Sequence, residues 1–192
     1  MCLEKSLSKK MIKLNRFYML LLLFVSQCVF AGSQILVIEN PPPPIDLTLV
    51  NRLWEYAKKE TGAPDNITPP KITLDWNVPK YARMGTQFPT IEIPDIPIQI
   101  SIAPRTIDSE DPLIVIWGLG HEITHYLFAL QENGWDLTLK VFSIKRRHHC
   151  DPEFKRITRG MAQELWNVYH SDDIRGKMFE EVIRSCANFP QQ

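Results

Sequence analysis

The sequence predicts an α+β domain in which helices pack on a short mixed or antiparallel sheet. Segments with the apolar spacing of helices alternate with short strand-like segments that prolines interrupt. With 44% hydrophobic residues in a chain of 192, the protein can bury a core of its own. Residues 111–134 are apolar on nearly every side, which predicts that this helix lies at the centre of the core.

The first 31 residues predict an export signal that is separate from the fold. Five basic residues precede the apolar run MLLLLFV at 19–25, and a small-residue pattern suited to cleavage ends at Ala31. The apolar run is shorter than the roughly 20 residues that a transmembrane helix needs. We therefore expect an exported protein, periplasmic or secreted. The alternative is that the signal segment stays uncleaved as an anchor, which would be the only contact with a membrane.

Loss of residues 1–31 makes the remaining chain acidic. It removes five of the 22 Lys and Arg and one of the 22 Asp and Glu, which leaves 17 basic and 21 acidic residues and a net charge of −4. We therefore expect no nucleic-acid partner, because nucleic acids bind basic surfaces. Cys150 and Cys186 remain after cleavage, and an oxidising compartment would allow an intrachain disulfide between them.

A proline-rich arm, residues 32–45, follows the signal. Four consecutive prolines in it favour an extended polyproline conformation. We expect the folded domain to span residues 46–192. Its first helix covers residues 46–61, where the apolar residues have helical spacing, and Gly62 suits the helix end.

The strand signals come next. Residues 69–79 alternate between polar and apolar side chains, as a half-buried strand does. The following stretch holds prolines at 89, 94, 97 and 104, which exclude a central strand where they occur. The segment IQISI at 98–102 can still be a strand, and we place it near an edge of the sheet.

The second half of the domain is predicted to be mostly helical. The helix at 111–134 starts with Asp111 as N-cap and Pro112 at its first position, and Gly134 ends it. A loop or short strand spans 135–144. A further Asp-Pro pair starts a helix that runs from 151 to about 169, and a last helix covers about 172–187.

The central helix carries the motif HEITH at 121–125. Residues i and i+4 of a helix lie about 40° apart around its axis, so His121 and His125 can bind one zinc ion from the same face. Glu122 lies near that ion and can take a proton from a zinc-bound water. Gly118 and Gly120 precede the motif, and a helix accepts such residues where another chain segment comes close.

A catalytic zinc ion needs a third protein ligand. The segment 148–151 stands just before a predicted helix, where a loop can bring a side chain to the motif. The residues after His125 that can bind zinc are His148, His149, Cys150, Asp151, Glu153, Glu164 and His170.

HEITH followed by HHCDPEFKRI resembles the pattern of the SprT-like metalloproteases, a family of small zincins. In that family a third histidine stands just before a second helix that opens with Pro-x-Phe, and residues 152–154 match that opening. The resemblance covers about residues 115–160. It implies that His121 and His125 are zinc ligands and that Glu122 is the general base.

The sequence differs from the family pattern at the third ligand. The family histidine stands four residues before the Phe, and that position here is Cys150, whereas His149 stands five before. A disulfide between Cys150 and Cys186 would leave His149 as the natural ligand. We therefore take His149 as the third ligand, with His148, Cys150 and Glu164 as open alternatives.

These observations predict an exported, zinc-dependent metallopeptidase of the small zincin type. Glu122 would activate a zinc-bound water that attacks a peptide bond. A peptide or protein substrate would lie extended on an edge strand, for which residues 98–102 are the best candidate. Two alternatives are a non-catalytic exported domain that binds zinc or a partner, and a zinc amidase acting on cell-wall peptides.

Overall fold

The computed structural model describes residues 45–80, 82–144, 148–172 and 175–180. Within them the chain is α+β, as predicted, with several helices and a small mixed sheet. The predicted signal (1–31), almost all of the predicted arm (32–45), Cys186 and most of the last predicted helix (172–187) lie outside the described residues.

The three long helices begin where the sequence predicts. Helix α2 spans Leu47–Thr61, α4 spans Pro112–Glu132 and α5 spans Pro152–Tyr169. Each helix follows an aspartate whose side chain accepts hydrogen bonds from backbone N–H groups of the first turn; the three caps are Asp46, Asp111 and Asp151. A short helix α3, Pro104–Ser109, connects β3 to α4 in the chain and was not predicted.

The described strands form a three-stranded sheet in the order β1-β3-β2. Strand β1 (Lys71–Leu74) runs parallel to β3 (Gln99–Ile102), and β2 (Met84–Gln87) runs antiparallel to it. The prediction that the segment 98–102 lies near an edge is wrong, because β3 pairs on both sides. Strands β1 and β2 form the two edges of the described sheet; β1 lies within the predicted segment 69–79, whereas β2 lies in the proline-rich region and was missed.

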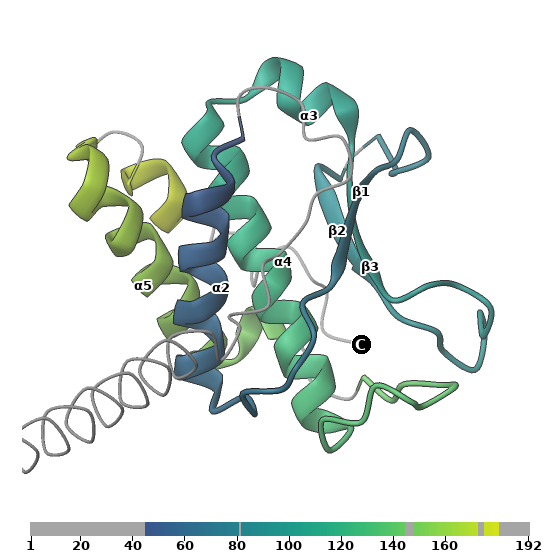
Figure 1. Ribbon diagram of the computed structural model, residues 1–192. Helices are drawn as coiled ribbons and strands as arrows, with labels where there is room; N and C mark the ends of the chain where they lie inside the picture. The colour runs from purple at the N-terminus through teal and green to yellow at the C-terminus, as the bar shows by residue number, and fades with distance from the viewer. Residues whose placement is uncertain (1–44, 81, 145–147, 173–174, 181–192) are drawn as a thin grey trace, which may run out of the picture. The chain divides into compact units, whose positions relative to one another are not determined.

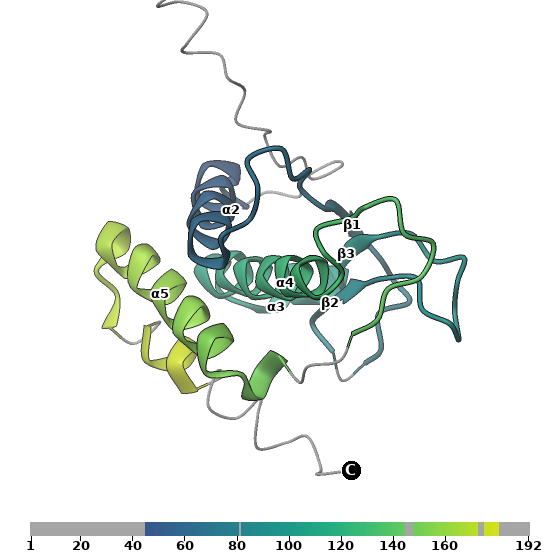
Figure 2. The ribbon, with the colours of Figure 1, turned by 90° about the horizontal axis from the view of Figure 1, so that it is seen from below.

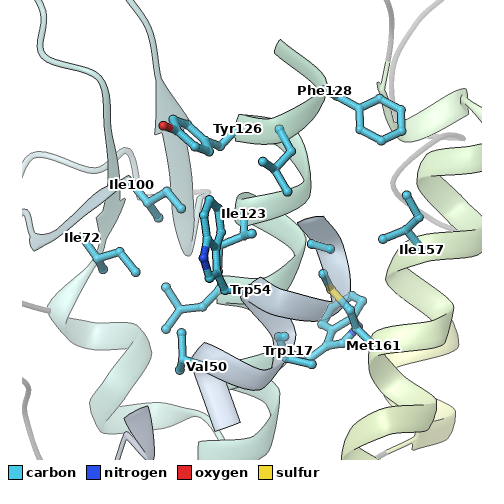
Figure 3. Close-up of a cluster of buried hydrophobic side chains, with 14 of the residues drawn as sticks. Val50, Trp54, Ile72, Ile100, Trp117, Ile123, Tyr126, Phe128, Ile157 and Met161 are labelled. Atoms are coloured by element: carbon cyan, nitrogen blue, oxygen red, sulfur yellow. The ribbon is translucent and has the colours of Figure 1, made fainter. Parts of the chain in front are cut away.

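Helix α4 lies between the sheet and the pair formed by α2 and α5 (Figures 1 and 2). Figure 3 shows Ile72 and Ile100 of the sheet on one side of α4, and Ile157 and Met161 of α5 on the other. These four side chains are all fully buried. The central, buried position that the sequence predicts for this helix is therefore confirmed. Helix α4 is also long and apolar enough to cross a membrane, but 72% of its most apolar window is buried, as in a core helix.

The two glycines before the motif let neighbouring side chains approach α4. A β-carbon at Gly120 would lie 2.8 Å from Leu53 Cδ1 of α2 and 2.8 Å from Met161 Sδ of α5. A β-carbon at Gly118 would lie 2.9 Å from the terminal methyl group of Met84 on β2. Close packing on both sides of α4 therefore explains the glycines, as the sequence indicated.

Candidate metal centre

Three histidine side chains meet on one side of α4. The Nε2 atoms of His121 and His125, one helical turn apart, are separated by 3.2 Å. The Nε2 atom of His149 lies 3.1 Å from that of His121 and 2.7 Å from that of His125. His149 comes from a short 3-10 helix, η1, that spans His148–Cys150 directly before α5. The structure thus brings together the three histidines that the sequence selected.

The arrangement depends on the way α5 starts. Asp151 caps α5 with its side chain, and its backbone N–H donates to the carbonyl oxygen of His148 at 2.9 Å. This turn holds η1 against α4. One turn into α5, the buried ring of Phe154 lies against the histidines, with centroid distances of 5.0 Å to His121 and 4.4 Å to His125.

Burial keeps these imidazoles neutral. It lowers the pKa of His121 to about 3, with a smaller contribution from His149. Burial, followed by the neighbouring histidines, lowers the pKa of His125 well below its usual value, and burial also lowers that of His149. Neutral imidazole is the form that binds a metal ion.

The geometry fits a cation between the three rings. Two nitrogens bound to one tetrahedral zinc ion at 2.0–2.1 Å lie about 3.3 Å apart, close to the separations found here. Without a cation, a proton on one Nε2 atom can form a hydrogen bond to only one of the other two. The lone pairs of the remaining nitrogen atoms would then face each other, which is unfavourable. A cation would attract all three. Three histidine ligands also form a known type of catalytic zinc site, so the residues present suit a metal ion.

Glu122 lies beside the histidines, and a residue of the sheet hydrogen-bonds to it. The hydroxyl of Thr86 on β2 lies 2.7 Å from Glu122 Oε2 and 2.9 Å from its backbone oxygen. Burial raises the pKa of Glu122 to about 6, and hydrogen bonds from the side chain and backbone of Thr86 oppose the increase. A carboxylate with such a pKa can act as a base near neutral pH.

A cavity of about 440 Å³ opens at the centre. Glu122, His125 and His149 line one part of it. Another part is lined by apolar side chains from β2 and the residue after it, from α4, and from the segment after α4: Met84, Phe88, Ala129 and Ile144. A ligand bound next to the histidines would therefore meet an apolar wall.

The structure gives each alternative to His149 as third ligand a different contact. Cys150 is disulfide-bonded and cannot offer a thiolate; its partner lies outside the described residues, so the pairing with Cys186 stays a prediction. Glu164 forms an ion pair with Arg52 on α2 at 2.8 Å and does not line the cavity at the histidines. His148 directs Nδ1 to His125 Nδ1 at 2.9 Å and does not join the triangle.

Sequence reasoning missed several residues that shape this centre. Thr86 was hidden because a strand in a proline-rich stretch gives a weak signal. Phe154 was noted only as part of a helix opening. Glu132 lies two helical turns after His125, and its spacing of seven residues could have placed it on the same face.

Comparison with protein families, curated proteins and solved structures finds no match to this chain.

Proposed function

We propose that this protein is an exported zinc-dependent metallopeptidase of the small zincin type. One observation carries the proposal: the three Nε2 atoms converge beside Glu122 at a cavity that a ligand can reach. The SprT-like resemblance agrees with this assignment, since its two histidines and glutamate are His121, His125 and Glu122. The predicted signal segment supports export.

His121, His125 and His149 would hold the zinc ion. When bound, zinc supplies a Lewis acid and lowers the pKa of water to about 7. Glu122 would accept the proton of the attacking water at its carboxylate and then donate it to the leaving amine. Thr86 fixes the orientation of the Glu122 carboxylate through its hydroxyl. The apolar wall of the cavity would exclude bulk water from the reacting carbonyl.

The substrate would lie along β2. This strand is at an edge of the described sheet and contributes Met84, Gly85 and Thr86 to the cavity lining, so an extended peptide can pair with it next to the histidines. The earlier candidate, residues 98–102, cannot serve because β3 pairs on both sides. The apolar wall favours a peptide with an apolar side chain next to the cleaved bond.

The test is Glu122→Gln in the purified mature protein. We expect the variant to bind one zinc ion per chain, as the parent does, because the three histidines are unchanged. Hydrolysis of an unstructured protein such as casein should fall by about 10²–10⁴-fold, the range for loss of a general base. Metal content and peptide release are the two measurements.

The same pair of measurements separates the alternatives. A variant that cleaves as fast as the parent would refute the role of Glu122. If the parent binds zinc but hydrolyses neither casein nor cell-wall peptides, the protein is a non-catalytic domain. If the parent hydrolyses cell-wall peptides but not casein, and Glu122→Gln loses this activity, the protein is an amidase that uses the same residues on another substrate.

A further inference from the structure

We propose that His148 and Glu132 position His125 for metal binding through a chain of contacts from His125 to His148 and on to Glu132. This inference rests on the proposed metal site. It assigns positioning roles to two residues outside the histidine triangle.

The contacts form one line. His125 Nδ1 lies 2.9 Å from His148 Nδ1, and His148 Nε2 lies 3.5 Å from Glu132 Oε1. The side chains of His148 and Glu132 are each only 5% exposed. A buried carboxylate at this distance from an imidazole nitrogen stabilises a proton on that nitrogen.

The positions of the protons follow from the chemistry of imidazole. If Nε2 of His125 binds a metal ion, its single proton is on Nδ1. Nδ1 of His148 must then accept this proton in the hydrogen bond, so the proton of His148 is on Nε2. That nitrogen faces Glu132. Each group in the line thus favours the tautomer that leaves His125 Nε2 ready to bind a metal.

The fold brings the three groups together from two segments. Glu132 follows His125 by seven residues on α4, so both lie on nearly the same face, about two turns apart. The helix η1 inserts the His148 ring beside this face. The two imidazole rings lie 5.1 Å apart between centroids with 28° between their planes, which suits a hydrogen bond between their Nδ1 atoms, and the His148 ring packs against Phe128 at 5.4 Å.

His121 is held differently. Its Nδ1 is buried and has no hydrogen-bond partner among the residues that the structure describes. The rings of Trp117 and Phe154 contact it at 5.6 Å and 5.0 Å. Packing therefore orients His121, whereas a polar chain orients His125. Loss of a polar partner of a metal-binding histidine typically weakens metal binding by about 10–100-fold.

Two substitutions of His148 separate the polar role from packing. His148→Asn keeps an acceptor near the Nδ1 position but loses the ring, whereas His148→Phe keeps a ring among Phe128 and Phe154 but loses the acceptor. We expect zinc affinity, measured by competition with a chelator on the full mature chain, to fall about 10–100-fold in His148→Phe and clearly less in His148→Asn. The reverse order would show that His148 acts only by packing and would overturn the proposal.

Glu132 is tested in the same assay with Glu132→Gln and Glu132→Leu. The amide oxygen of Gln can still accept from His148, so its zinc affinity should lie between those of the parent and Glu132→Leu. The visible spectrum of the cobalt-substituted protein should change in Glu132→Leu, because His125 moves. Glu164→Gln is the matched control, since Glu164 pairs with Arg52 on α2 and does not line the cavity.

The results also separate this inference from the proposed function. Zinc affinity within twofold of the parent in both His148→Phe and Glu132→Leu overturns the positioning chain and leaves the metal site intact. A parent that binds no zinc overturns both. If His148→Phe does not fold, judged by its circular dichroism, the comparison of the two Glu132 variants decides.

Discussion

Thr86 connects the sheet to the chemistry of the centre at the scale of single residues. Its hydroxyl contacts the carboxylate of Glu122, and this contact lowers the pKa of a group that burial raises. The two effects act on the same carboxylate in opposite directions. The pKa of Glu122 therefore depends both on its burial on α4, which raises it, and on the hydrogen bonds from Thr86 on β2, which lower it.

Thr86→Val should expose this balance, because it keeps the shape of the side chain and removes the hydroxyl. Without the hydrogen bond the pKa of Glu122 rises further, and less of the base is deprotonated in weak acid. Relative to the parent, kcat/KM should fall about two- to tenfold more at pH 6 than at pH 8. Thr86→Ser keeps the hydroxyl and should follow the parent. If the decrease of kcat/KM toward acid pH occurs at the same pH in Thr86→Val as in the parent, the prediction is contradicted.

The histidines of the centre were predictable from the sequence, and their supporting residues were not. His121 and His125 follow from helical spacing alone, and His149 followed once Cys150 was assigned to a disulfide. The contacts made by Thr86, His148 and Glu132 depend on tertiary packing between segments that are distant in sequence. Local periodicity can place Glu132 on the same face of α4 as His125, but it does not show which distant segment packs against that face.

At the scale of elements, the helices were more predictable than the strands. Asp-Pro starts and apolar spacing placed α4 and α5 to within about two residues at each end, since caps and periodicity are local signals. The strands are only four residues long each, and β2 contains Gly85 in place of an alternating apolar residue. Such a segment has no periodic signal, so the edge strand next to the centre could not be recognised.

The cavity between α4, β2 and the segment after α4 predicts substrate preference. Ala129→Leu would fill part of the cavity from α4, and Ile144→Ala would enlarge the cavity from the segment after α4. We expect Ala129→Leu to reduce kcat/KM about 10–100-fold for peptides with a large apolar side chain next to the cleaved bond, and much less for peptides with alanine there. Ile144→Ala should shift the preference the other way.

Zinc content and the unfolding midpoint serve as controls for these two variants. Ile144 is 47% exposed, so its truncation should leave the fold intact. Ala129 is fully buried, and a lower unfolding midpoint would report that the added leucine disturbs the core instead of filling the cavity. Equal losses for large and small side chains in Ala129→Leu would argue against this wall as the determinant of preference.

At the scale of the whole molecule, the neutral histidines make folding depend on pH even without metal. In the unfolded chain a histidine binds a proton below about pH 6.5, whereas burial lowers the pKa of His121, His125 and His149 in the fold. The unfolded state therefore binds more protons as the pH falls from about 6.5 toward 3, and the free energy of unfolding decreases. Glu122 acts in the opposite direction, because its raised pKa lets the folded state bind a proton first between about 4.5 and 6. One glutamate opposes three histidines, so the net effect in this range is a loss of stability.

Zinc should strengthen this dependence, because it binds the neutral imidazoles and competes with protons for them. At a free zinc concentration of about 100 times Kd, zinc stabilises the fold by about 2.7 kcal/mol, which raises Tm by several degrees in a domain of this size. We expect the increase in Tm to be largest at about pH 8 and to disappear near pH 5, as followed by thermal unfolding of the full chain with and without zinc. His170→Asn is the control, since His170 is exposed at the end of α5 in a left-handed conformation that asparagine tolerates, and it should behave as the parent. An increase of the same size at both pH values would mean that zinc binds outside the three histidines.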